Sequence, residues 1–208
     1  MMKVVSTNVG KPQKYTLDDV TIATSMVRHS VPELTINKLR VEGDEFANPE
    51  FHGEFDAVVY ALSADRYPEW EKFLNKSFPL GHLGENLSID KLREEDFYLG
   101  DEYQVGTAIL RATGPRYPCN KLNYSSGDKR LQREFESRDW CGIYFEVVKE
   151  GKAKPGDELK LVKRVQDQFT VLDLYQAMRA KKKGQRDDAK SAKLIACEQL
   201  LEKYHKRV

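Results

Sequence analysis

The segment GPRYPCNKL at residues 114–122 holds the residue types best suited to chemistry. Two prolines restrict the backbone around Arg116 and Cys119. A loop stiffened in this way holds its side chains with little entropy left to lose, as a ligand-positioning segment requires. If the charges of Arg116 and Lys121 lie close, they favour the thiolate of Cys119, the form that binds soft metals. The spacing alone is equally compatible with a turn whose cysteine only packs.

Two further clusters bring polar groups together in turn-rich stretches. In VEGDEFANPEFHGEFDAV at 41–58, His52 could donate to an anion or bind a cofactor, although a lone loop histidine more often makes one structural hydrogen bond. In LGHLGENLSI at 80–89, Gly84 permits unusual backbone angles, and it is followed by the carboxylate of Glu85, an acceptor, and the side-chain amide of Asn86. Together the clusters offer these candidate site residues: Gly43, Asp44, His52, Gly53, Asp56, Glu85 and Asn86.

The motifs of several common enzyme classes are absent from the sequence. It contains no phosphate-binding P-loop, no dinucleotide-binding GxGxxG, no HExxH and no EF-hand loop. Its four histidines lack zinc-ligand spacing, and its three cysteines form no CxxC pair. We therefore expect reduced thiols, and we interpret Cys141 and Cys197 as small apolar side chains.

The composition and net charge of the chain limit the classes of partner that we expect it to bind. With 40% hydrophobic and 32% charged residues the chain is typical of folded globular proteins, and its formal net charge of +1 gives no basic footprint for nucleic acid. No stretch approaches the roughly 18 apolar residues that a membrane span requires. We expect a cytoplasmic protein that binds neither nucleic acid nor membrane.

The elements that must position these residues are mostly strands. Apolar and β-branched runs at 4–9, 20–27, 57–63 and around Gly106 are typical of strands. The runs at 143–148 and 158–165 flank a Pro-Gly turn and predict a hairpin. Many short strands with few helical segments favour a β-barrel over alternating βαβ units.

Helical patterns interrupt and then follow the strands. We expect short helices within 64–76 and 128–139 that close the ends of the barrel. From Thr170 the apolar period becomes helical, with one face through Val171 and Met178 and another through Leu194 and Tyr204. The sequence thus predicts an α+β, mainly β fold, with a barrel domain at 1–165 and a small helical tail at 166–208. The basic KKKGQR and KYHKRV stretches of the tail could contact phosphates, but charge runs of this kind are usually solvated helix faces, and we interpret them so.

Taken in order, the motifs resemble the MOSC family, the domain also found at the C-terminus of molybdenum cofactor sulfurases, and most of all its free-standing bacterial YiiM-like group. The matching motifs are NVGKP at 8–12, Gly43-Asp44, HGEFDAV at 52–58, GENL at 84–87, GDEYQVG at 100–106 and PRYPCNKL at 115–122. The resemblance covers roughly residues 1–165, and the tail resembles the small three-helix extension of the same group.

Two features depart from the family pattern. Glu54 stands where the family has the second glycine of H-G-G, which places a carboxylate where backbone room is usual. The region ahead of Gly43 also lacks the usual Lys-x-Pro-Val. These departures indicate a different approach to the cofactor and a different substrate rim.

The resemblance implies a MOSC-type β-barrel that binds the molybdenum cofactor (molybdopterin), with Cys119 as the ligand of the metal. Arg116 and Lys121 are expected near anionic groups of the cofactor. The candidates Gly43, Asp44, His52, Gly53, Glu85 and Asn86 are expected to line the same pocket, and Asp56 is the candidate catalytic acid.

The leading function that follows is an oxidoreductase that reduces N-hydroxylated compounds such as hydroxylamino-purines or amidoximes. A separate reductase must supply the electrons, because the chain has no flavin, nicotinamide or iron–sulfur fingerprint of its own. Two alternatives stay open: a carrier that holds the cofactor or sulfur without turnover, and a barrel that has lost its cofactor and serves as an interaction module.

Overall fold

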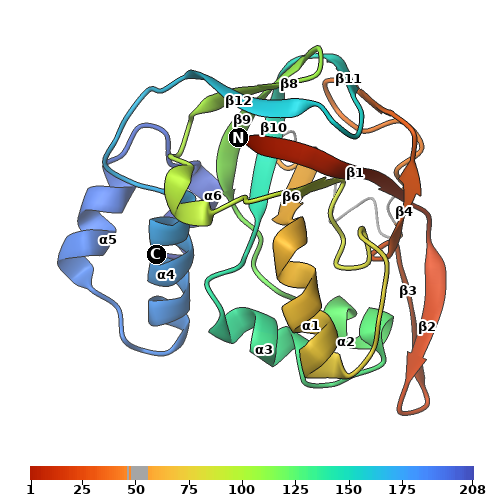
Figure 1. Ribbon diagram of the computed structural model, residues 1–208. Coiled ribbons are helices and arrows are strands. Elements are labelled where there is room, and N and C mark those ends of the chain that lie inside the picture. The colour runs from red at the N-terminus through yellow and green to blue at the C-terminus, as the bar shows by residue number, and fades with distance from the viewer. Residues whose placement is uncertain (46, 48–55) are drawn as a thin grey trace.

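A closed barrel of seven strands lies at the centre of the computed structural model, which describes residues 1–45, 47 and 56–208 (Figure 1). The strands are β1 (Met2–Gly10), β2 (Gln13–Leu17), β3 (Val20–Thr24), β4 (Arg28–Val31), β5 (Leu34–Ile36), β6 (Val59–Ser63), β7 (Leu87–Ile89), β8 (Glu102–Val105), β9 (Ala108–Pro115), β10 (Ile143–Lys149), β11 (Gly151–Ala153) and β12 (Glu158–Lys163). Around the barrel the order is β12, β8, β9, β10, β6, β7 and β1, and β1 pairs with β12 to close the ring. Closure leaves these strands without a free edge.

Two hairpins follow directly from local sequence. Asp18 and Asp19 both adopt positive φ in the two-residue turn between β2 and β3, as such a tight hairpin turn requires. This hairpin stands away from the barrel and returns the chain at Thr24. Strands β8 and β9 pair up to Val105 and Ala108, so the predicted strands around Gly106 do form a hairpin.

The hairpin predicted between 143–148 and 158–165 is wrong. Both segments are strands, but β10 lies between β9 and β6, so both of its edges are already occupied. The chain leaves β10 to form β11, which pairs with β5, and returns as β12 against β8 and β1. The Pro-Gly turn forms locally, with the Asp157 amide donating to the Lys154 carbonyl, yet barrel closure decides the pairing.

Three helices cover one end of the barrel: the two predicted within 64–76 and 128–139 form, and a third, which the sequence did not predict, begins at Lys121. They are α1 (Tyr67–Leu74), α2 (Lys121–Ser126) and α3 (Leu131–Ser137), which lie together in Figure 1. Two short 3-10 turns complete the helical segments: η2 (Ala64–Arg66) directly follows β6, and η3 (Glu94–Asp96) precedes β8. Beneath the helices lies an apolar cluster that is separate from the larger core of the barrel. It gathers around Trp70, whose ring stacks on that of Phe135 with a centroid distance of 5.1 Å.

The tail contains α4 (Val171–Lys182), α5 (Asp188–Ile195) and α6 (Glu202–His205), the three helices that the resemblance implies. A capping box at Thr170 and Asp173 starts α4 where the apolar period changes. The second predicted helical face is divided, because residues 197–201 form a turn between α5 and α6.

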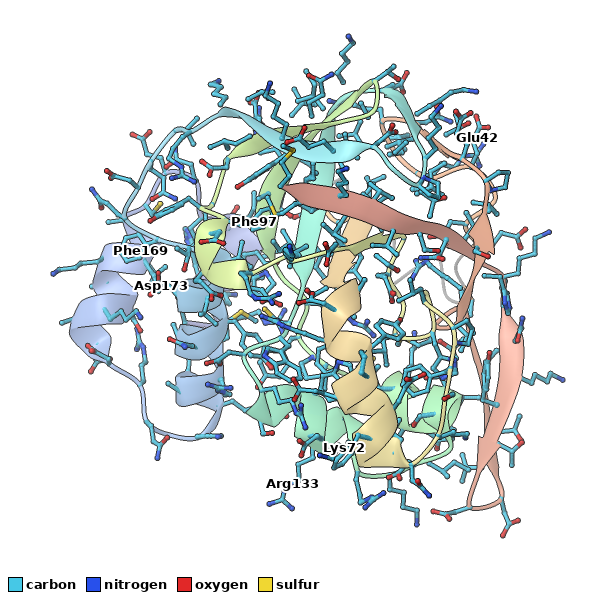
Figure 2. All side chains as sticks on the ribbon, in the orientation of Figure 1. Glu42, Lys72, Phe97, Arg133, Phe169 and Asp173 are labelled. Atoms are coloured by element: carbon cyan, nitrogen blue, oxygen red, sulfur yellow. The ribbon has the colours of Figure 1, made fainter. Side chains whose placement is uncertain are left out.

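The tail packs into the barrel's own apolar core. Val171 and Tyr175 belong to the same buried cluster as the strands. The backbone joins the two parts as well: the Leu99 amide donates to the Phe169 carbonyl, and the Val171 amide donates to the Phe97 carbonyl. Figure 2 labels Phe97 in the barrel and Phe169 just before the tail. In the described ranges, no helix has the length and apolar character needed to span a membrane. The predicted fold class, a mainly β barrel with short helices and a helical extension, is confirmed.

Candidate active site

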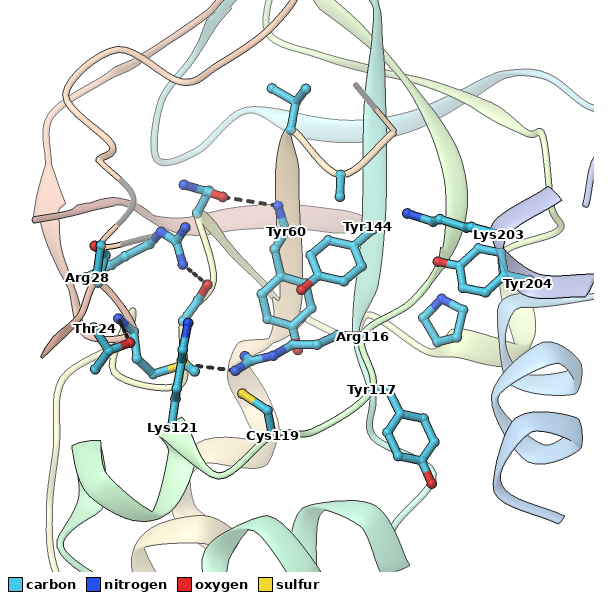
Figure 3. Close-up of a pocket in the computed structure, with 18 of the residues that line it drawn as sticks. Thr24, Arg28, Tyr60, Arg116, Tyr117, Cys119, Lys121, Tyr144, Lys203 and Tyr204 are labelled. Atoms are coloured by element: carbon cyan, nitrogen blue, oxygen red, sulfur yellow. Dashed lines mark hydrogen bonds between the residues drawn. The ribbon is translucent and has the colours of Figure 1, made fainter. Parts of the chain in front are cut away.

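A cavity of about 400 Å³ opens between the barrel wall, the loop after β9 and helix α6 (Figure 3). This volume is typical of sites for small molecules and cofactors. No carboxyl group occurs among the described residues that line it, whereas five cationic side chains do. The cations are Arg28, Arg116, Lys121, Lys203 and Arg207. The cavity is therefore suited to an anionic ligand.

Arg116 is the most deeply placed of these cations, with 5% of its surface exposed. Its guanidinium donates to the Leu83 carbonyl and to the sulfur of Met26, and it lies 5.0 Å above the ring of Tyr60. Burial opposes its charge, but neighbouring tyrosine hydroxyls and the Cys119 thiol raise the pKa of Arg116 above its usual range. No acidic side chain in the described part of the chain forms an ion pair with it. A buried charge of this kind normally has a counter-charge, which a ligand can provide.

Cys119 lies beside Arg116 in the loop between β9 and α2. It is a free cysteine, half-buried, and it packs on the apolar cluster beneath the helices. Its carbonyl accepts from the Leu122 amide, so the first turn of α2 fixes the loop. The thiol points into the cavity in Figure 3. Sulfur is the soft donor of this site.

The lack of a side chain at Gly84 lets Met26 and Arg116 approach the backbone closely. Its φ is +95°, and a Cβ there would lie 2.8 Å from the Met26 sulfur and 3.0 Å from an Arg116 nitrogen. A larger residue would displace both groups. The unusual backbone expected at the G-E-N turn is thus required by the close approach of Met26 and Arg116.

Asp44 organises a second wall without lining the cavity itself. Its carboxylate accepts two hydrogen bonds from Arg28, at 3.0 and 2.7 Å, one from the Gly10 amide at 2.7 Å and one from Asn86 at 3.0 Å. Gly43, with φ +78°, turns the chain just before it. Arg28 and Asn86 line the cavity, so Asp44 is a positioning residue for both.

Glu85 is fully buried behind the cavity wall. One carboxylate oxygen accepts from the Tyr67 hydroxyl at 2.6 Å, the Gly81 amide at 2.7 Å and the Ser88 hydroxyl at 2.8 Å. The other oxygen has no hydrogen-bond partner among the described residues. Burial raises the pKa of Glu85 above its ordinary value. Glu85 shapes the turn that carries Gly84 and does not reach the cavity.

The helical tail forms one wall of the cavity. Lys203, Tyr204 and Arg207 line it, so the KYHKRV stretch is a solvated face only in part, as at the exposed Lys206. Lys203 donates to the Asp56 carboxylate at 2.6 Å, which ties α6 to the segment before β6. A Cβ on Gly114 would lie 2.6 Å from the Tyr204 hydroxyl, so this glycine admits the tail to the site.

The structure thus brings Arg116, Cys119, Lys121 and Asn86 to one cavity and sets Gly43, Asp44, Glu85 and Asp56 around it. His52, Gly53 and Glu54 lie outside the described residues. Sequence reasoning missed the aromatic lining and Arg28. A basic stretch with an interleaved tyrosine, KYHKRV, was the one available signal for the tail. Among the residues described, no cluster of three or more His, Cys, Asp or Glu side chains could bind a metal ion.

Comparison with protein families identifies this architecture. The MOSC domain model matches residues 48–160, which is more than half of the chain. The chain belongs to the MOSC family. The resemblance carried by its motifs is therefore confirmed.

Individual MOSC relatives agree with this assignment. YflK of Bacillus subtilis strain 168 is 34% identical over 81% of this chain and 76% of its own length, and YiiM of Escherichia coli K12 is 33% identical over 65% and 62%. A protein of Gibberella moniliformis named "Reductase" is 29% identical over 78% of this chain, which spans 29% of that longer protein. The crystal structure of YiiM from Geobacillus stearothermophilus superimposes with a TM-score of 0.79 at 25% identity, covering 99% and 96% of the two chains.

Proposed function

We propose that this protein is an oxidoreductase that reduces N-hydroxylated compounds, with the molybdenum cofactor bound at Cys119. The main support for this proposal is the buried guanidinium of Arg116, which has no acidic partner among the described residues and lies beside the Cys119 thiol. Membership of a family associated with this cofactor supports the proposal, as does a relative named as a reductase.

The residues of the cavity fit such a cofactor in kind. Cys119 would hold the metal through a soft thiolate, and the cations Arg116 and Lys121 would bind the anionic groups of the pterin. Asn86, fixed by Asp44 and by the Tyr60 amide at 3.1 Å, adds a rigid amide to the lining. When bound, the cofactor would supply the two-electron chemistry at the N–O bond of the substrate. We propose that the electrons come from a separate flavin or haem reductase.

Expression in a host that makes the molybdenum cofactor tests the proposal. We expect the purified protein to contain molybdenum and to convert an amidoxime to the amidine when a reductase is supplied. Cys119→Ser should lose the metal and the activity with little change in melting temperature, because one atom changes at a half-buried position.

Two matched variants control for the loss of a thiol elsewhere. Cys141 is fully buried, so Cys141→Ser should cost about 1–3 kcal/mol of stability but retain molybdenum. Cys197 is half-buried, and Cys197→Ser should change neither property. Absence of molybdenum from the wild type would overturn the proposal. Molybdenum without turnover, and its transfer to an apo-molybdoenzyme, would favour the carrier alternative instead.

A further inference from the structure

The reaction proposed above needs a source of protons at the cavity. Reduction of an N-hydroxylated compound breaks the N–O bond, takes up two electrons and two protons, and releases water and the amine. Asp56, the acid predicted from the sequence, is held in its ion pair with Lys203 and is not among the lining residues. None of the described lining residues has a carboxyl group, so the proton donors that these residues offer are hydroxyl, thiol and cationic groups.

Four tyrosines line the cavity, and three of their hydroxyls are already engaged. Tyr60 donates to the Cys141 carbonyl at 2.9 Å, and Tyr117 donates to Glu136 at 2.7 Å. The Tyr204 hydroxyl packs on the backbone at Gly114. The hydroxyl of Tyr144 makes no hydrogen bond within the described ranges and is not occluded from the cavity. It is the phenol free to meet a substrate.

The strand around Tyr144 holds this phenol rigidly. In β10 its backbone pairs with Tyr60 on one side and Gly114 on the other, and its carbonyl accepts from the Thr113 hydroxyl at 2.9 Å. Its ring packs on the ring of Tyr60 at a centroid distance of 5.1 Å. The guanidinium of Arg116 lies over the same Tyr60 ring, so the phenol and the buried cation face one part of the cavity (Figure 3).

We propose that Tyr144 is the proton donor of the reduction, delivering its hydroxyl proton to the substrate oxygen as the N–O bond breaks. The oxygen leaves as water, the separate reductase supplies the two electrons, and the second proton reaches the nitrogen from solvent. Arg116 stabilises the phenolate that remains on Tyr144, because a fixed cation in a desolvated site favours the anionic form. Solvent then reprotonates the phenolate. This inference rests on the proposed function.

Tyr144→Phe tests the step by removing only the hydroxyl. We expect kcat for an amidoxime to fall by about 10²–10⁴-fold, the usual contribution of a positioned acid, while the molybdenum content and the melting temperature stay at wild-type values. The O-acetyl ester of the same amidoxime provides a sharper comparison, since its leaving group departs as acetate without a proton. With the ester, the two proteins should differ by only a few-fold, an outcome that a distorted site would not give.

A binding measurement on cofactor-free protein gives a second readout. Calorimetry should show Tyr144→Phe binding a hydroxylamino-purine about twofold to tenfold more weakly than wild type, as the loss of one hydrogen bond predicts. Adenine lacks the oxygen and should bind both proteins equally. Tyr175→Phe is the matched control, because this phenol contacts the carbonyl of Glu136 at 3.2 Å, away from the cavity.

Different results would contradict the role of Tyr144 and the proposed function. A wild-type enzyme that turns over the amidoxime together with an equally active Tyr144→Phe would overturn the role of Tyr144 alone. That role is also overturned if the variant loses as much activity with the ester as with the amidoxime. A wild-type protein without any turnover would overturn the proposed function, and the proton donor with it.

Discussion

Asp44→Ala should be among the most damaging single substitutions near the cavity. The Asp44 side chain is 2% exposed and that of its partner Arg28 is 11% exposed. Removal of the carboxylate leaves the Arg28 guanidinium buried without a counter-charge. The Gly10 amide loses its acceptor, and the Asn86 amide loses one of its two, keeping only the Asn8 carbonyl at 3.3 Å. Breaking a buried pair from one side costs about 3–5 kcal/mol. Since two cavity residues lose their anchor, bound cofactor should fall as well.

Urea unfolding measures this cost as a lower midpoint at an unchanged slope. The additional substitution Arg28→Leu should cost less in the Asp44→Ala background than in the wild type, because it removes the uncompensated charge. Glu33→Ala is the control, since its pair with Lys152 is exposed and salt-screened, and its midpoint should stay near the wild-type value. A loss below about 1 kcal/mol for Asp44→Ala would refute the view of Asp44 as the anchor of this wall.

Two further substitutions probe the tail and the pH dependence. Gly114→Ala should cost about 1–3 kcal/mol and reduce cofactor retention, because the new methyl meets the Tyr204 hydroxyl; an unchanged melting temperature would contradict this. Burial lowers the pKa of His82 to about 4, so the folded state binds fewer protons than the unfolded state between pH 6.5 and 4. Acidification through that window should therefore remove up to about 3 kcal/mol of stability. His82→Asn should flatten this slope in urea titrations at several pH values, and an equal slope in both proteins would count against it.

Local patterns in the sequence located most elements. The period change at Thr170 marks the start of α4, and Gly106 lies in a real hairpin turn. These succeed because caps and tight turns depend on a few neighbouring residues. The predicted pairing of β10 with β12 failed because strand partners are set by barrel closure, which has no local signal. A favourable turn sequence therefore does not show that the strands on its two sides pair with each other.

The candidate site was predictable in its chemistry but not in its walls. The stiff loop that carries Arg116 and Cys119 is recognisable by its prolines. The wall formed by Lys203 and Tyr204 comes from more than 80 residues further along the chain, and only the packing of α6 against the strand at Gly114 brings it to the cavity. A basic helix end in a single sequence looks the same whether it faces solvent or a ligand.

The closing pair of the barrel sets the order in which the chain can fold. Met2 pairs with Leu159 and Lys3 with Glu158, so the first strand has to wait for one of the last before the ring is complete. Until then one edge each of β1 and β8 offers unpaired amides and carbonyls to other nascent chains. Contacts this distant in sequence make loop closure slow, which places such topologies among the slower folders. Crowded overexpression should therefore favour aggregation of incompletely closed barrels, and a slower rate of synthesis or a lower temperature should raise the soluble yield.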